Sequence, residues 1–300
     1  MQRVALFYAA MRYLLLLGGL LASVVRVQGQ IQVDLKLPRL QFIAYEPVVA
    51  TLHITNLAGR DVELRDGDGQ AWFGFEITGN EGQPIAPLRN NAQPPLKIEA
   101  GKRVTQKINL TPLYPVHDLG TYHVRAHIYF GDLGRFFYSA AKVFEVTTAR
   151  PIWQKTVGIP EASPATGNVR TYSLLSNRFS DHTSLYVRVE DRDTGVVYAT
   201  YSLGRIIAFD EPHAEIDLRN ELHVLHCGSP RNWTYSHIGL NGELLSKSSF
   251  IETKTRPRLT HNPDGAVAVR GGMAETPVPP AARVPVPKLS DRPAEMPKEN

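Results

Sequence analysis

The chain has 300 residues, of which 43% are hydrophobic and 21% are charged, as in an ordinary globular protein. This length favours two domains. The formal charge is +4, and removing the three arginines of residues 1–29, a segment without acidic residues, leaves +1. The sequence has no basic stripe with interleaved aromatic residues, the usual pattern of nucleic-acid-binding proteins, so we do not expect a nucleic-acid partner.

Residues 1–29 are typical of a secretory signal peptide. Arg3 and Arg12 precede an apolar run of 13 residues at 13–25, and Val27 and Gly29 lie three and one residues before a cut at Gln30. The alternative is an uncleaved membrane anchor, but such a run would cover only about 20 Å of a hydrocarbon core roughly 30 Å thick. We expect a secreted or periplasmic protein with no membrane span after cleavage.

The chain contains a single cysteine, Cys227. An exported protein with one thiol has no internal disulfide, so its stability must come from the burial of a core.

Residues 30–149 are predicted to form an antiparallel β-sandwich. Short alternating or β-branched segments separated by turn residues predict strands at 31–37, 48–55, 72–78, 96–98, 104–110, 122–130 and 136–147. Residues 83–95 contain four prolines and are predicted to be a loop. No helical period interrupts this pattern, and seven short strands in about 115 residues favour a sandwich.

A tight turn precedes the longest of these strands. Asp118, Gly120 and Tyr122 are followed by an apolar alternation to Phe130. This pattern resembles the tyrosine corner of immunoglobulin-like (Ig-like) domains, in which the phenol hydroxyl bonds to the backbone a few residues upstream. Antibody domains have a cysteine two residues after the tyrosine, whereas this chain has Val124, so the resemblance is to disulfide-free bacterial Ig-like domains. It implies a structural role for these residues.

Residues 150–168 are rich in proline and glycine and are predicted to be a linker, with room for one strand at 152–157. Residues 169–272 are predicted to form a second, smaller antiparallel β domain built from hairpins, one of which turns at Asn241-Gly242. Similar segments at Leu185, Leu222 and Ala266 are 37 and 44 residues apart. This period resembles that of β-propeller repeats. The chain has room for fewer than three complete copies, however, and a closed propeller needs four to eight blades. A small meander domain and an open propeller fragment are therefore both compatible with the sequence.

Residues 273–300 contain seven prolines and few large apolar side chains. This composition predicts a disordered tail.

Few side chains are arranged for chemistry. The turn at 66–69 contains two aspartates, but Ile77 stands where a calcium loop needs its last glutamate. Metal-ligand residue types gather only at His223, His226, Cys227 and His237, where His226 is expected on the opposite face of its strand.

Other candidate groups are weaker. His123 and His127 would be about 13 Å apart on one strand. A cysteine nucleophile at Cys227 lacks the strand-to-helix setting of a nucleophile elbow. The paired carboxylates (Glu190, Asp191, Asp193, Asp210 and Glu211) are expected to be solvated in turns. We therefore predict no catalytic residue, no metal ligand and no cofactor.

Tyr129, Phe137 and Tyr138 flank the turn at 131–134 and are predicted to form an apolar patch that contacts a partner. The resulting interpretation is an exported, non-enzymatic binding or assembly protein of the cell envelope or extracellular space. Its partner would be an envelope or extracellular protein or a glycan.

Two alternatives remain open. One is a secreted glycan-acting hydrolase or its accessory subunit, which requires a pocket with two carboxylates about 5–10 Å apart. The other is an Ig-like proteinase inhibitor that presents residues 83–95 as a rigid loop.

Overall fold

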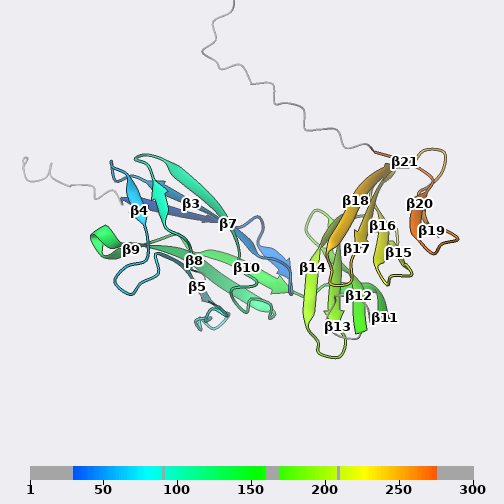
Figure 1. The fold of residues 1–300 in the computed structure, drawn as a ribbon, viewed down its shortest axis with the longest axis horizontal. Coiled ribbons are helices and arrows are strands. Elements are labelled where there is room, and N and C mark those ends of the chain that lie inside the picture. Colours follow the sequence, from blue (N-terminus) through cyan, green and yellow to red (C-terminus); the bar gives the residue numbers. More distant parts are fainter. Residues whose placement is uncertain (1–29, 90–91, 160–168, 208–209, 276–300) are drawn as a thin grey trace, which may run out of the picture. The chain divides into compact units, whose positions relative to one another are not determined.

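The computed structural model describes residues 30–89, 92–159, 169–207 and 210–275 (Figure 1). The predicted signal peptide, residues 160–168 of the predicted linker and the tail from residue 276 lie outside the described residues. The chain divides into two compact units, residues 1–148 and 149–300, which are described separately below. Long regular elements in the described ranges are all β-strands, so the predicted all-β fold is confirmed. Those ranges contain no helix with the length and apolar character needed to span a membrane.

The first unit contains two main sheets. Its elements are β1 (Ile31–Lys36), β2 (Gln41–Ile43), β3 (Val49–Asn56), β4 (Val62–Leu64), β5 (Phe73–Thr78), β6 (Leu96–Ile98), β7 (Arg103–Asn109), β8 (Gly120–Phe130), the 3-10 turn η1 (Gly131–Leu133), β9 (Arg135–Tyr138) and β10 (Lys142–Thr147). One sheet has the strand order β1-β3-β7, and the other has the order β2-β10-β8-β5 with β9 paired to β8. All pairs are antiparallel except β2 with β10, which is parallel.

One core joins the two sheets of this unit. The apolar alternation of β8 directs its five core side chains inward (Tyr122, Val124, Ala126, Ile128 and Phe130). They share this core with Leu52 and Ile54 of the facing sheet. Because a shift of one residue would bury Arg125 in their place, the alternation fixes the register of β8. The unit is therefore sandwich-like.

The predicted strand 136–147 is wrong in one respect, because it is divided into β9 and β10. Residues 139–141 lie between them, and Ser139 fills the break. Its Oγ atom accepts a hydrogen bond from the backbone N–H of Ala126 at 3.0 Å and donates one to the carbonyl of Ala140. The side chain thus satisfies a backbone donor of β8 where no opposite strand residue can.

The turn before β8 has the geometry of a corner. The hydroxyl of Tyr122 donates a hydrogen bond of 2.8 Å to the carbonyl of Asp118. Gly120 has a φ of +147°, and a Cβ atom there would lie 2.2 Å from Nδ2 of Asn80, so only glycine fits. Burial raises the pKa of Tyr122, which keeps the hydroxyl protonated as a donor.

Replacing Tyr122 with phenylalanine is expected to lower the free energy of unfolding of the first unit by about 1 kcal/mol. The ring would still fill the core, while the carbonyl of Asp118 would lose its partner. Urea unfolding followed by tryptophan fluorescence, which reports on buried Trp72, measures the change. Tyr138→Phe removes a hydroxyl from an exposed ring of the same unit and is the control expected to change nothing; equal effects would contradict the role of the corner.

The second unit is built from strands that follow one another along the chain. Its elements are β11 (Arg150–Gly158), β12 (Val169–Arg178), β13 (Thr183–Asp191), β14 (Val197–Ile206), β15 (His213–Ile216), β16 (Leu222–Ser229), β17 (Asn232–Ile238), β18 (Leu244–Ile251), β19 (Arg258–His261), β20 (Val267–Arg270) and β21 (Met273–Ala274). The strand orders are β11-β12-β13-β14, β15-β16-β17-β18-β21 and β19-β20. All of these pairs are antiparallel.

The two larger sheets of the second unit share a core. We call the sheet β11-β12-β13-β14 the first meander and the sheet β15-β16-β17-β18-β21 the second meander. Leu174 and Val187 of the first meander pack in one buried cluster with Val224 and Ile238 of the second. On the opposite face of β16 and β17, a smaller cluster around Trp233 packs against the β19-β20 hairpin. The second meander is thus covered on both faces.

Three boundaries differ from the sequence prediction. Residues 150–158, predicted as part of a linker with room for one strand at 152–157, form the longer strand β11, because Trp153 and Val157 pack on the shared core. Met273 and Ala274, predicted as the start of the tail, form β21, which pairs with Ile251 and Phe250. The third repeat expected near Ala266 is a two-stranded hairpin and not another meander.

Arg170 joins the two meanders. This arginine of β12 is 0% exposed, and its guanidinium donates hydrogen bonds to Oδ2 of Asp191 at 2.9 Å, to Oδ1 of Asn241 at 3.0 Å and to the carbonyl of Leu240 at 3.2 Å. Its guanidinium also lies 4.1 Å from the ring centre of Tyr198. Leu240 and Asn241 belong to the turn between β17 and β18, so one buried cation links a strand of one sheet to a hairpin of the other.

Candidate metal centre

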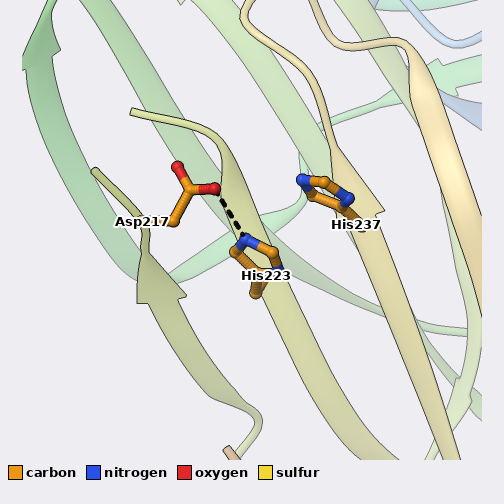
Figure 2. Close-up of side chains that lie close together, drawn as sticks. All are labelled: Asp217, His223 and His237. Atoms are coloured by element: carbon orange, nitrogen blue, oxygen red, sulfur yellow. Dashed lines mark ion pairs between the residues drawn. The ribbon is translucent and has the colours of Figure 1, made fainter. Parts of the chain in front are cut away.

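Asp217, His223 and His237 converge on the face of the second meander that lies opposite the shared core. His223 on β16 and His237 on β17 are direct cross-strand partners, and Asp217 directly follows β15 (Figure 2). Each residue offers one ligand atom, and the three atoms lie within 4.8 Å of one another. Hairpin pairing therefore gathers three potential metal ligands from two neighbouring strands and the turn that leads into one of them.

The turn between β15 and β16 fixes the carboxylate of Asp217. Its Oδ1 atom accepts hydrogen bonds of 2.9 Å from the backbone N–H groups of Arg219 and Glu221. Its Oδ2 atom lies 3.3 Å from Nε2 of His223. The exposed guanidinium of Arg219 approaches the same oxygen to 3.6 Å. One oxygen thus organises the turn, and the other points at the histidine.

The two histidines differ in their partners. Nδ1 of His223 lies 2.7 Å from the hydroxyl of Tyr235, whereas its buried Nε2 atom has no hydrogen bond of normal geometry within the part of the chain that the structure describes. Nε2 of His237 lies 2.8 Å from Oε2 of Glu221. The imidazole rings are stacked with their centres 4.1 Å apart and their planes 14° from parallel.

The protonation of the cluster follows from its burial. Burial lowers the pKa of His223 against the opposing influence of Asp217, so the imidazole is neutral at pH 7. Burial alone would raise the pKa of Asp217, but the backbone N–H of Glu221 and the nearby His223 outweigh it and the net direction is downward. A neutral imidazole and an ionised carboxylate are the forms that bind metal ions.

The remaining metal-type residues of the sequence prediction lie elsewhere. His226 points to the shared core, as its strand position predicts, and is 1% exposed. Burial, together with the charge of Lys247, lowers the pKa of His226 to about 4. The thiol of Cys227 packs with Trp233 and donates a hydrogen bond to the carbonyl of Ser229 at 3.2 Å, and burial raises its pKa. A protonated, buried thiol suits a structural role.

The acidic candidates also have structural partners. In the turn at 66–69, Asp66 accepts a hydrogen bond from the backbone N–H of Trp72, and Asp68 accepts one from the hydroxyl of Tyr129. Asp191, expected to be solvated, is buried against Arg170 instead. A cavity of about 220 Å³ lies beside Tyr122, and the single carboxyl group among its described lining residues is that of Asp118. This cavity does not have the pair of acids that glycoside hydrolysis requires.

The predicted partner patch has a different composition in the structure. On the outer face of β8 and β9, away from the core, the rings of His127, Tyr129, Phe136 and Tyr138 are in contact; we call this cluster the outer aromatic face. Phe137 pairs with Ile128 and packs on the core side, so Phe136 takes the place predicted for it. Within this cluster Tyr129 is buried, whereas Tyr138 is 44% exposed.

Arg125 lies over this face, 4.5 Å from the ring centre of Tyr138, and its Nε atom donates a hydrogen bond of 2.7 Å to Glu76. His127 is half-buried against Phe136, and burial lowers its pKa. His123, on the same face of β8, is exposed. The two histidines that share a strand face are therefore not part of one site.

Asp217 was missing from the sequence prediction, since it lies in a turn six residues before the first histidine. The sequence did contain a signal for the pairing of His223 with His237. The turn between Ser229 and Asn232 aligns β16 with β17. Counting outward from this turn, and allowing for one bulge between Cys227 and Ser229, places His223 opposite His237.

No protein-family model matches the chain, and neither does any curated protein.

Proposed function

We propose that the chain is an exported, non-enzymatic binding or assembly protein of the cell envelope or extracellular space. The observation that carries the proposal is the outer aromatic face of the first unit. Aromatic and arginine side chains are enriched at protein interfaces, where rigid rings bury large areas at a low cost in conformational entropy. Tyr138, Phe136 and Arg125 bring both kinds of side chain together outside the core.

The same chemistry suits a protein or a glycan partner. Rings stack on apolar side chains or on the apolar face of a sugar, and the guanidinium of Arg125 with the carboxylate of Glu76 supplies polar groups beside them. Export supports an envelope or extracellular location for this partner, since residues 1–29 carry the signal-peptide pattern.

For the first unit we propose an Ig-like identity of the disulfide-free type. Two facing sheets around one core and the hydrogen bond from Tyr122 to Asp118 support it. For the second unit we propose two meanders related to propeller blades, β11 to β14 and β15 to β18, the second extended by β21; the sequential order of the first four strands in each sheet supports it.

Crosslinking followed by mass spectrometry, in cells that produce the protein, tests the proposed function. The full chain is compared with the double variant Phe136→Ser/Tyr138→Ser, which removes the two rings at the surface. We expect a reproducible set of envelope or extracellular partners for the wild type and at least a tenfold loss of one of them for the variant.

The control is Val196→Ser in the second unit, which removes a 51% exposed apolar side chain that is not part of the outer aromatic face. It is expected to retain every partner. Circular dichroism must show that all three proteins are folded. A double variant that keeps all partners would refute the role of this face, and the absence of any partner for the wild type would refute the binding function.

A further inference from the structure

Three side chains with metal-ligand chemistry, Asp217, His223 and His237, come together in the second unit (Figure 2). We propose that they form a binding site for Zn²⁺. This proposal is independent of the outer aromatic face, which belongs to the other unit.

The spacing of two donors already matches zinc. Two ligands at 2.0–2.1 Å from an ion, with a tetrahedral angle between them, are about 3.3 Å apart. Oδ2 of Asp217 and Nε2 of His223 are 3.3 Å apart. The ligand atom of His237 completes a triangle in which no side exceeds 4.8 Å, so the three donors lie close to one another but must draw closer to reach one ion.

His223 is oriented for this role by its other nitrogen. The residue is 3% exposed, and the Nδ1–H group of its ring can donate to the hydroxyl of Tyr235 at 2.7 Å. In that tautomer the lone pair of Nε2 faces the carboxylate of Asp217, an arrangement that a cation between them stabilises. A metal-bound histidine usually donates its second ring N–H to such a partner, which fixes the tautomer and the ring orientation.

The donor set favours a transition-metal ion. Two imidazoles and one carboxylate suit Zn²⁺ and its first-row neighbours, whereas Ca²⁺ and Mg²⁺ prefer oxygen ligands alone. Among these ions, the 3.3 Å donor spacing is that of tetrahedral zinc. Three protein ligands leave a fourth position for water or for Glu221, whose Oε2 atom lies 2.8 Å from Nε2 of His237.

Binding requires one local adjustment. The two rings are nearly parallel, so one must rotate about χ2 before both lone pairs meet at one point. His237 is the freer of the two, with 14% of its side chain exposed compared with 4% for His223. Rotation of this ring also releases Glu221, which can then remain paired with Arg219 at 3.1 Å.

Isothermal titration of the full, tag-free chain with ZnCl₂ tests the proposal. We expect one zinc ion per chain for the wild type and a loss of affinity of at least about tenfold for Asp217→Asn, His223→Ala and His237→Ala. Titration with Co²⁺ adds a structural readout, because a tetrahedral site gives an intense visible absorption band that the three variants should lack.

The matched control is His182→Ala. His182 forms a pair with Asp181 at 2.7 Å on the surface of the same unit, so it reports zinc binding to an ordinary histidine–aspartate pair. It is expected to bind zinc like the wild type. If His223→Ala does not fold, Asp217→Asn, which keeps the size of the side chain, decides the question. Failure of the wild type to bind zinc at a one-to-one ratio, or unchanged affinity in Asp217→Asn, would overturn the proposal.

Discussion

Replacing Arg170 with methionine is expected to destabilise the second unit by about 3–5 kcal/mol, the usual cost of removing one partner from a buried ion pair. Methionine fills much of the space of the arginine stem but donates no hydrogen bond. Asp191 would be left buried without a counter-charge, and the acceptors of Leu240 and Asn241 would lose their donor. Urea unfolding monitored by the fluorescence of Trp233, which is buried in this unit, measures the loss.

Arg205→Met is the matched control for this prediction. Arg205 forms an ion pair of 3.4 Å with Asp181, and both side chains are about two-thirds exposed, at 65% and 66%. Exposed pairs contribute little, so the control should change the free energy of unfolding by less than about 1 kcal/mol. Equal losses in the two variants would show that Arg170 does not act as the link between the meanders.

His226 is expected to make the second unit sensitive to acid. Its pKa is about 4 in the folded protein, and the unperturbed value is 6.5. Between pH 6.5 and pH 4, His226 is protonated in the unfolded chain but stays neutral in the folded chain. The free energy of unfolding therefore falls as the pH decreases through this range. This residue contributes a loss of about 3 kcal/mol at pH 4, and no change above pH 7.

Urea unfolding at a series of pH values between 4 and 7 measures this effect. His226→Gln cannot take up the proton, so its stability should depend less steeply on pH, by about 1.4 kcal/mol per pH unit in the middle of the window. The comparison uses slopes, because the substitution also changes packing against Gly204 and shifts the whole curve. Parallel curves for wild type and variant would show that His226 is not the responsible group.

Periodicity in the sequence predicted most of the strands, because alternation reports directly which face of a strand is buried. The strand of Tyr122 and the hairpin at Asn241-Gly242 are examples. The prediction was incomplete where a long-range contact decides the outcome. The segment 150–158 was assigned to a linker with room for one strand, and it forms the strand β11 because Trp153 packs on a core contributed by distant residues.

The same reason explains the error at Asp191. It was expected to be solvated in a turn, but it is buried against Arg170, whose guanidinium also bonds to the carbonyl of Leu240, 70 residues away. The error at Phe137 has another origin. Phe137 and Tyr138 are adjacent on β9 and point to opposite faces, so strand alternation alone excludes placing both in one patch.

The order of strand pairing also determines when each unit can be completed during synthesis. In the first unit β2 pairs with β10, and Thr147 reaches back 105 residues to bond with the carbonyl of Phe42. In the two meanders of the second unit, strands that pair with each other mostly follow one another along the chain, as in β11 to β14. Loop closure over a long separation is costly in entropy and slows folding. The first unit, although made first, must therefore keep the β2 edge of its sheet unpaired until nearly half of the protein has been synthesised.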